Sequence, residues 1–224
     1  MIGIIGAMEE EVAALKSEMA DAKVTEFASM TFYKGTLCGK DTVVVRSGIG
    51  KVNAAICAQI LVDKFGVDTL INTGIAGSLD ARIDIGDMVI STDAVHHDMD
   101  ATIFGDAIGQ VPRMDTRTFP ADPHLVELAV KANEKANPQI HTFTGRVASG
   151  DQFISSGEVK ARIVENFQAL CTEMEAAYLN KVSYVIIRAI SDKADNSATM
   201  DYPEFEKQAI AHSVALVKEL LPMI

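Results

Sequence analysis

Apolar runs typical of buried strands recur along the whole chain. Most of them are continuously apolar and do not alternate with polar residues, which predicts strands that are covered on both faces. The clearest runs span residues 2–5, 42–46, 69–72, 88–91, 142–147 and 183–190. We therefore expect a sheet that lies inside the protein, between layers of helix.

Segments with the periodicity of helices lie between many of these runs. Val12, Leu15 and Met19 share one face of the first segment. Asp122-Pro123 is a typical cap and first-turn pair, so a helix is expected to follow it. The other expected helices span residues 54–65, 124–136, 158–167, 173–181 and about 203–221.

This alternation predicts an α/β fold in a single domain over residues 1–224, with a mixed central β-sheet flanked by helices. The sheet is expected to be mixed because residues 23–46 have strand character throughout, broken only at Gly35 and at Gly39-Lys40-Asp41. Such a segment is typical of consecutive antiparallel strands. Residues 98–122 show no period, and loops of that length usually serve an interface or a function.

The composition narrows the function classes. Lysine and arginine number 20 against 31 acidic residues, a formal net charge of −11, which argues against nucleic-acid binding. Hydrophobic residues make up 48% of the chain, enough for a sizeable core. Three widely spaced cysteines, no secretory signal and no run long enough to span a membrane lead us to expect a cytoplasmic protein.

Carboxylates follow the first strand in Gly6-Ala7-Met8-Glu9-Glu10-Glu11. Open α/β sheets bind ligands at the carboxyl ends of their strands, so these acids are candidates for a site. Acidic residues in a first helical turn also complement the helix dipole. Both interpretations stay open on this evidence.

Small residues follow two further strands, in 46–51 and in 72–78. They favour either loops whose amides approach a ligand or ordinary tight turns, and neither segment is a known phosphate-binding motif. His96-His97 is expected to be a polar strand end and no metal site, since neighbouring residues on a strand point to opposite faces.

Acidic residues also stand at two later positions. Glu173-Met174-Glu175 is expected to open a short helix, where carboxylates either bind ribose hydroxyls or form a solvated turn. Asp192 ends a buried strand, where an acid is costly unless it is paired or kept neutral by a raised pKa. A neutral Asp192 can act as a general acid, and the alternative is an ion pair with Arg188 or a loop cap.

Six short motifs occur in a fixed order along the chain, and together they are specific. They are Ile4-Ile5-Gly6-Ala7-Met8-Glu9-Glu10-Glu11, Ser47-Gly48-Ile49-Gly50-Lys51-Val52, Asn72-Thr73-Gly74, Ser149-Gly150-Asp151-Gln152-Phe153-Ile154, Glu173-Met174-Glu175 and Arg188-Ala189-Ile190-Ser191-Asp192. With these motifs the chain resembles the bacterial 5′-methylthioadenosine/S-adenosylhomocysteine nucleosidases, in the nucleoside phosphorylase superfamily.

The resemblance implies a nucleoside phosphorylase-like fold and hydrolysis of an adenosine N-glycosidic bond, without metal or organic cofactor. By analogy, Asp192 protonates purine N7, Glu11 activates the attacking water and Glu175 binds the ribose hydroxyls. Arg188 and Ser191 would help to place the water and the acid. An acid on the leaving group and a base on water suit the oxocarbenium-like transition state of glycoside cleavage.

The resemblance also implies the remaining substrate-binding residues. Phe153 would stack on adenine, and Pro112 matches a loop that reaches the neighbouring subunit's site, which implies a homodimer. The other matching positions are Met8, Ile49, Ala76, Gly77, Phe104, Ile154, Met174 and Tyr202. The chain departs from the family pattern at Ile75, where serine is usual, at Asp106-Ala107 and at Tyr202, where phenylalanine is common.

Three alternatives remain at this stage. A phosphate-dependent purine nucleoside phosphorylase would need cations around its phosphate, and only Arg188, Arg46 and Lys51 are candidates. A nucleosidase acting on 6-amino-6-deoxyfutalosine would share the motifs. A nucleoside-binding module without catalysis is the third alternative, because fold alone does not establish function.

Overall fold

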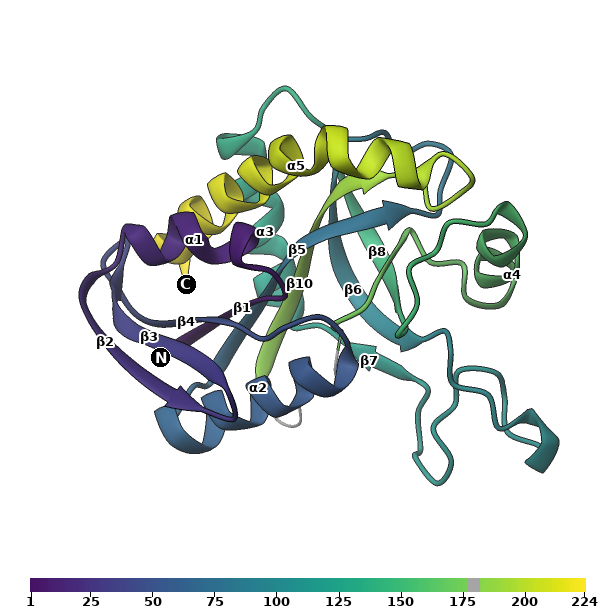
Figure 1. The fold of residues 1–224 in the computed structure, drawn as a ribbon, viewed down its shortest axis with the longest axis horizontal. Helices are drawn as coiled ribbons and strands as arrows, with labels where there is room; N and C mark the ends of the chain where they lie inside the picture. The colour runs from purple at the N-terminus through teal and green to yellow at the C-terminus, as the bar shows by residue number, and fades with distance from the viewer. Residues whose placement is uncertain (177–181) are drawn as a thin grey trace.

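In the computed structural model, which describes residues 1–176 and 182–224, ten strands form one mixed sheet (Figure 1). Their order is β10-β6-β8-β9-β5-β1-β4-β3-β2, with β7 beside β6 and an additional β10–β5 pairing. The strands are β1 (Ile2–Gly6), β2 (Ala20–Phe27), β3 (Met30–Leu37), β4 (Lys40–Arg46), β5 (Thr69–Ser78), β6 (Met88–His96), β7 (Thr118–Pro120), β8 (Thr142–Ser149), β9 (Cys171–Glu173) and β10 (Ser183–Asp192).

The strand directions confirm the predicted mixed sheet. β1 runs parallel to β4 and β5, and β5 runs parallel to β10. β2, β3 and β4 form the consecutive antiparallel strands expected from residues 23–46. The carboxyl ends of β1, β4, β5 and β10 therefore meet at one edge of the sheet.

Helices cover both faces of this sheet (Figure 1). They are α1 (Glu9–Ser17), α2 (Lys51–Phe65), α3 (Pro123–Ala136), α4 (Gly157–Phe167) and α5 (Ala198–Leu220), with short 3₁₀ helices η1 (Thr102–Phe104) and η2 (Leu221–Met223). α2 packs on one face, while α1, α3 and α5 pack together on the other. The Asp122 side chain accepts hydrogen bonds from the first turn of α3, as the Asp122-Pro123 pair predicts.

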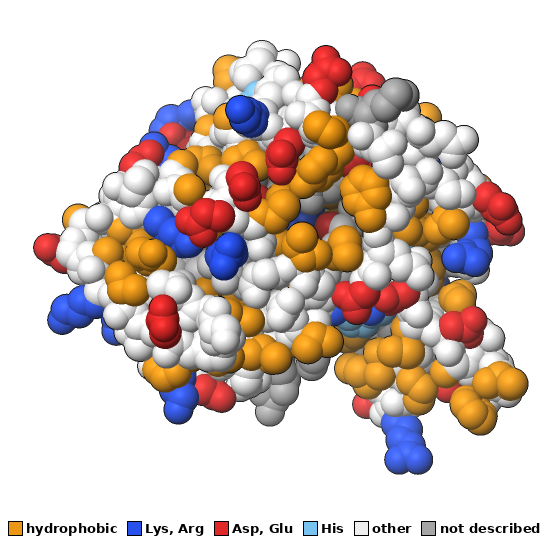
Figure 2. Space-filling model, in the orientation of Figure 1, with side chains coloured by type: hydrophobic (Ala, Val, Ile, Leu, Met, Phe, Trp, Pro, Cys, Tyr) orange, Lys and Arg blue, Asp and Glu red, His pale blue; other side chains and the backbone are white. Residues whose placement is uncertain are grey.

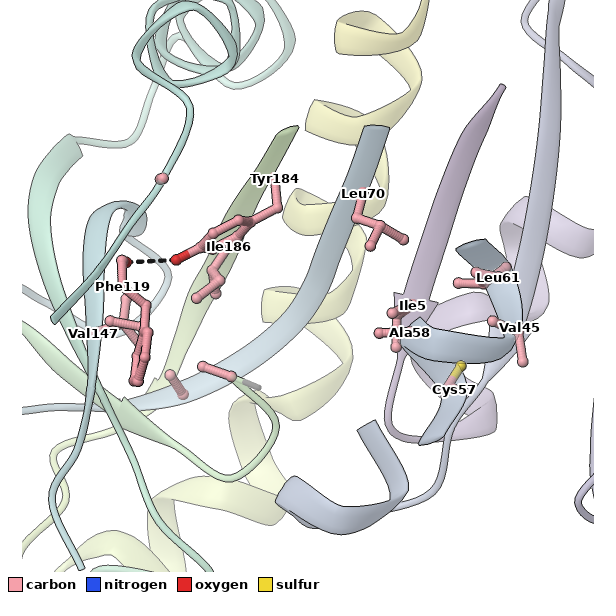
Figure 3. Close-up of a cluster of buried hydrophobic side chains, with 14 of the residues drawn as sticks. Ile5, Val45, Cys57, Ala58, Leu61, Leu70, Phe119, Val147, Tyr184 and Ile186 are labelled. Carbon is pink, nitrogen blue, oxygen red and sulfur yellow. Dashed lines mark hydrogen bonds between the residues drawn. The ribbon is translucent and has the colours of Figure 1, made fainter. Parts of the chain in front are cut away.

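Successive residues of the central strands enter different layers of the core. Ile5 and Val45 pack on the α2 face, whereas Ile4 and Val44 pack on the face of α1 and α5. This two-sided burial is why the strands are continuously apolar in sequence, because side chains alternate between faces along a strand. Figure 3 shows Ile5 and Val45 beside Ala58 and Leu61 of α2.

The segment 98–122 is mostly irregular, as expected, but it is anchored to the sheet through β7. β7 pairs with β6, and the buried hydroxyl of Tyr184 donates a hydrogen bond of 2.5 Å to the carbonyl oxygen of Phe119 (Figure 3). Beyond this anchor, the part that contains η1 projects from the body of the protein (Figure 1).

Three predicted boundaries are wrong. β5 continues to Ser78, so the glycine-rich segment after residue 72 is strand and not a loop. Glu173 ends strand β9 and does not open a helix, while residues 177–181 of that expected helix lie outside the described residues. α5 begins five residues before Pro203, which brings Tyr202 onto the helix.

No helix among the described residues is long and apolar enough to cross a membrane.

Candidate active site

A cavity of about 240 Å³ opens at the edge of the sheet where β1, β5, β8, β9 and β10 end. Most of the residues predicted from the sequence line it. They are Met8, Glu11, Ile49, Ala76, Gly77, Phe153, Ile154, Met174, Glu175, Ser191, Asp192 and Tyr202. With Glu173, which also lines it, the cavity combines four acidic residues with a mainly apolar wall, a composition typical of small-molecule sites.

Glu11 is the one acid of the Glu9-Glu10-Glu11 triplet that enters the cavity. Its Oε2 accepts hydrogen bonds from the backbone N–H groups of Ala7 at 2.7 Å and Met8 at 2.9 Å, and its Oε1 accepts one from Ile75 at 3.2 Å. Burial raises the pKa of Glu11, although Arg188 and these N–H groups oppose the shift. Glu11 therefore both caps its own helix and presents a carboxyl group of raised basicity.

Glu175 accepts weaker hydrogen bonds than Glu11. The N–H of Gly50 donates to its Oε1 at 3.2 Å, and the N–H of Met174 donates to its Oε2 at 3.3 Å. Burial, reinforced by the nearby charge of Glu173, raises the pKa of Glu175 to about 7. A carboxyl group with so few fixed donors keeps lone pairs free for ligand hydroxyls.

Arg188 lies behind the cavity wall and is fully buried. Its Nη2 donates to Glu173 Oε2 at 2.5 Å and to Asn72 Oδ1 at 2.7 Å, and it lies 3.8 Å from Glu175 Oε2. Glu173 is held further by the N–H groups of Glu175 and Ala176. The guanidinium is therefore shared by a group of carboxylates, and the sequence-based alternative of an Arg188–Asp192 pair is wrong.

Asp192 ends β10 and is 2% exposed. Its Oδ1 accepts a hydrogen bond from the N–H of Ala194 at 2.8 Å, and its Oδ2 accepts one from the Ser191 hydroxyl at 2.9 Å. Burial raises the pKa of Asp192, and these two neutral donors only partly oppose the shift. Its surroundings therefore favour the protonated form, which a general acid requires.

Two glycines of β5 make room for the two acids. A Cβ atom at Gly74 would lie 2.4 Å from Glu11 Oε1, and one at Gly77 would lie 2.7 Å from Asp192 Oδ1. Any side chain at either position would displace a carboxyl group. The sequence predicted these glycines as turn or ligand-approach residues, and the structure shows that they let the two carboxyl groups approach β5 closely. The two glycines lie about 10 Å apart along the strand, at a rise of about 3.3 Å per residue.

Hydrophobic side chains form the mouth of the cavity. The rings of Phe153 and Tyr202 meet edge to face, with their centroids 5.9 Å apart. The Tyr202 hydroxyl contacts Met8 Sδ at 3.4 Å and Glu206 Oε1 at 3.0 Å. Phe153 and Ile49 are about half exposed, so apolar surface remains available to a ligand.

Phe104 and Pro112 do not line this cavity. Phe104 lies on η1 and is 86% exposed, and Pro112 is exposed in the same projecting segment. Arg46 and Lys51 also lie outside the lining, and Lys51 forms an ion pair with Asp98. In the described part of the chain, no group of three or more potential metal ligands is found.

Five lining residues were given no individual role by the sequence-based prediction: Ala7, Ile75, Gln152, Thr172 and Glu173. Glu173 matters most, because it binds Arg188. The sequence pointed to it beside Glu175 as a candidate for ribose binding, but not to its contact with Arg188. The three-residue strand β9 owes its form to pairing with β5 and β8, which leaves no periodic signal.

Comparisons with known proteins agree with this geometry. The family model described as phosphorylase superfamily matches residues 1–222. A 5′-methylthioadenosine/S-adenosylhomocysteine nucleosidase of Staphylococcus saprophyticus is 43% identical, with 100% of both chains covered.

Two solved structures are similar over the whole chain. The nucleosidase of the same name from Neisseria meningitidis, in complex with methylthio-immucillin-A, has a TM-score of 0.95 and 39% identity, covering 100% of this chain and 99% of the other. A futalosine hydrolase from Helicobacter pylori has a TM-score of 0.93 and 30% identity, covering 100% and 97%.

Proposed function

The chain belongs to the phosphorylase superfamily, and we propose that its cavity hydrolyses the N-glycosidic bond of 5′-methylthioadenosine and S-adenosylhomocysteine. The products are adenine and the 5-thio-substituted ribose. One observation carries the proposal: Glu11, Glu175 and Asp192, all with raised pKa values, meet in one cavity of a chain similar throughout its length to such nucleosidases.

Asp192 is the general acid of the proposed mechanism. It donates its proton to purine N7, so that adenine leaves as a neutral molecule when the glycosidic bond breaks. Burial raises the pKa of Asp192, which favours the protonated form that this role requires. Ser191 supports the role because its hydroxyl donates to the oxygen that does not accept from Ala194, which fixes the orientation of the carboxyl group.

Glu11 is the general base. It accepts a proton from the attacking water as positive charge develops on the ribose, and Arg188 stabilises the charged carboxylates around it. Glu175 binds the 2′- and 3′-hydroxyls, with Met174 packed nearby. Glu11 and Asp192 come from different elements and line the same cavity, which supports this division between base and acid.

The apolar wall suits the two ends of the substrate. Phe153 stacks on adenine, and backbone groups of Ile154 bind the edge of the base; both residues line the cavity, which supports these roles. Met8, Ile49 and Tyr202 surround the ribose and the 5′-thio substituent. A thioether tail gains from apolar contact, whereas a charged 5′-phosphate would lose hydration there.

Hydrolysis fits the cavity better than phosphorolysis. The described lining residues include no lysine or arginine, and the guanidinium of Arg188 is already bound to Glu173 and Asn72. Glu11 and Glu175 would repel a phosphate at the position of the attacking nucleophile. The similarity to a futalosine hydrolase keeps 6-amino-6-deoxyfutalosine as the second candidate substrate.

We further propose that the chain acts as one domain over residues 1–224, as a homodimer in the cytoplasm. The projecting segment that contains Phe104 and Pro112 supports the dimer. Ile103 and Phe104 are 88% and 86% exposed, and Figure 2 shows hydrophobic side chains on this projection at the lower right. Such apolar surface is typical of an interface, and its insertion beside a partner's cavity would complete the binding site.

The decisive experiment measures adenine release spectrophotometrically in a buffer free of phosphate. We expect turnover of 5′-methylthioadenosine and S-adenosylhomocysteine, with a free reducing pentose as the second product. A strict requirement for phosphate, with a pentose 1-phosphate as product, would show a phosphorylase instead. Ligand binding without adenine release would show a binding module, and turnover of 6-amino-6-deoxyfutalosine alone would correct the substrate.

A further inference from the structure

A hydrogen-bonded network outside the cavity connects three chain segments to Glu175. It consists of the side chains of Lys51, Asp98 and Asp151 and the backbone of Gly50. These residues lie at the start of α2, just after β6 and just after β8. None of them lines the cavity, so the proposed mechanism leaves the network without a role.

The first link is the N–H of Gly50, which donates to Glu175 Oε1 at 3.2 Å. Gly50 has φ +101°, a conformation that side-chain-bearing residues rarely adopt, and it precedes α2 without a side-chain cap of its own. A Cβ atom at Gly50 would lie 3.2 Å from Asp151 Oδ1, so the turn packs tightly against Asp151. The direction of this N–H therefore depends on what holds the turn.

The second link is the bond between the turn and Asp151. The N–H of Lys51 donates to Asp151 Oδ1 at 2.8 Å. The Asp151 N–H in turn donates to Asp98 Oδ2 at 2.9 Å, and the Lys51 ammonium donates to Asp98 Oδ1. Asp98 thus binds both Lys51 and Asp151, one through each carboxylate oxygen.

Asp98 is well placed for this task because its ion pair is shielded from water. The side chains of Lys51 and Asp98 are only 17% and 16% exposed. Burial alone would raise the pKa of Asp98, but the hydrogen bonds from Lys51 and from the Asp151 N–H outweigh it and lower the pKa. The carboxylate therefore stays charged over the neutral pH range.

We propose that Asp98 is a positioning residue for the reaction, acting through Lys51 and Asp151 to aim the Gly50 N–H at Glu175. This inference rests on the proposed binding of the ribose hydroxyls by Glu175. Gly50 holds one Glu175 oxygen and the Met174 N–H holds the other, so each oxygen keeps a lone pair for the substrate. Without Asp98 the turn loosens, and the hydrogen bonds to the 2′- and 3′-hydroxyls weaken.

The test compares two substrates, 5′-methylthioadenosine and its 3′-deoxy analogue, which lacks one hydroxyl that Glu175 binds. We expect Asp98→Ala to lower kcat/KM for 5′-methylthioadenosine roughly tenfold, as for a weakened hydrogen bond to a charged group. For the 3′-deoxy analogue we expect a smaller loss, because one of the two affected hydrogen bonds is already missing.

Asp93→Ala is the matched control. Asp93 pairs with Arg146 between β6 and β8, the two strands that lead to the network, and these side chains are 21% and 26% exposed. Neither residue lines the cavity. This variant is expected to change kcat/KM by the same factor for both substrates.

If Asp98→Ala lowered kcat/KM by the same factor for both substrates, the proposal would be overturned, since equal losses indicate a merely structural role. If Asp98→Ala does not fold, Lys51→Met replaces it, with the same selective loss expected and the same equal loss contradicting it. Glu175→Gln separates the two hypotheses. If Glu175→Gln also lowers kcat/KM by the same factor for both substrates, the proposed role of Glu175 is wrong. If only Glu175→Gln, and not Asp98→Ala, gives unequal losses, the proposed role of Asp98 is wrong.

Discussion

Two sides of the same cavity hold their carboxyl groups by different means. On the ribose side, Glu11, Glu173 and Glu175 surround one guanidinium, that of Arg188. On the side of the proposed acid, the described partners of Asp192 are a hydroxyl and a backbone N–H, which both donate to it. Burial raises the pKa of Glu11, Glu175 and Asp192 alike, so burial alone does not assign their roles.

The difference lies in what each side stabilises. A guanidinium favours ionised carboxylates, which a base and a hydroxyl-binding group need. Among the described residues, no cation is a hydrogen-bond partner of Asp192, and burial raises its pKa, which favours the protonated form that an acid requires. The proposed acid and the proposed base thus lie in different surroundings within one cavity.

The largest expected effect tests the acid side. Asp192→Asn keeps the size of the side chain and an oxygen for the Ala194 N–H, but it cannot donate a carboxylic proton. We expect kcat for 5′-methylthioadenosine to fall roughly a thousandfold or more, within the range for lost general acid catalysis. Adenine release measures the rate, and calorimetric titration with a non-hydrolysable adenosine analogue measures binding, which should change little.

Turnover by Asp192→Asn close to that of the wild-type protein would exclude Asp192 as the acid. Ser191→Ala is the companion variant, because it removes only the hydroxyl that orients Asp192. Its loss should be much smaller and confined to kcat.

The fold could largely be predicted from the sequence, because its signals are local. Continuous apolar strands reflect burial on both faces, and Asp122-Pro123 marks the start of α3. Glu11 also carried a signal. It stands four residues before the buried Leu15 on the same helical face, whereas the half-exposed Glu9 pairs with Lys16.

The remaining features depend on contacts between distant segments. Glu173 is placed by β9, whose three residues form a strand only because β5 and β8 lie beside them. The glycine spacing in β5 acquires its meaning when Glu11 and Asp192 approach Gly74 and Gly77 from other elements. No periodicity within one segment reveals such an arrangement.

The second prediction concerns stability on the ribose side. The pKa of Glu175 is about 7 in the folded protein against an ordinary value of 4.5. Between these pH values the folded state holds more protons than the unfolded chain, so stability falls as the pH rises through this interval. Glu175→Gln removes the charge and should stabilise the unliganded protein at pH 8 relative to pH 5, by about 3 kcal/mol at most.

Thermal unfolding at pH 5 and pH 8 measures this difference, and roughly 2–4 °C in Tm is expected for each kcal/mol. The control is Glu127→Gln, whose carboxylate pairs with Lys131 on the surface of α3. This substitution should give no comparable gain at high pH. If the Tm difference between Glu175→Gln and wild type were independent of pH, the ribose side would not hold a carboxyl group of raised pKa.

The smallest expected effect separates the two sides by titration. As the proposed base, Glu11 would act when ionised, so kcat/KM should rise with pH through its pKa. As the proposed acid, Asp192 would act when protonated, so kcat/KM should fall through its own. The buried Ile75 lines the cavity and donates its N–H to Glu11 Oε1. Ile75→Ser places a hydroxyl where an apolar side chain excludes water, which relieves the burial that raises the pKa of Glu11.

The acid limb of the pH profile should move down by less than about one pH unit, while the basic limb stays in place. Ile75→Val keeps the apolar surroundings and should move neither limb; a shift of the basic limb in Ile75→Ser would show that the two sides titrate as one unit.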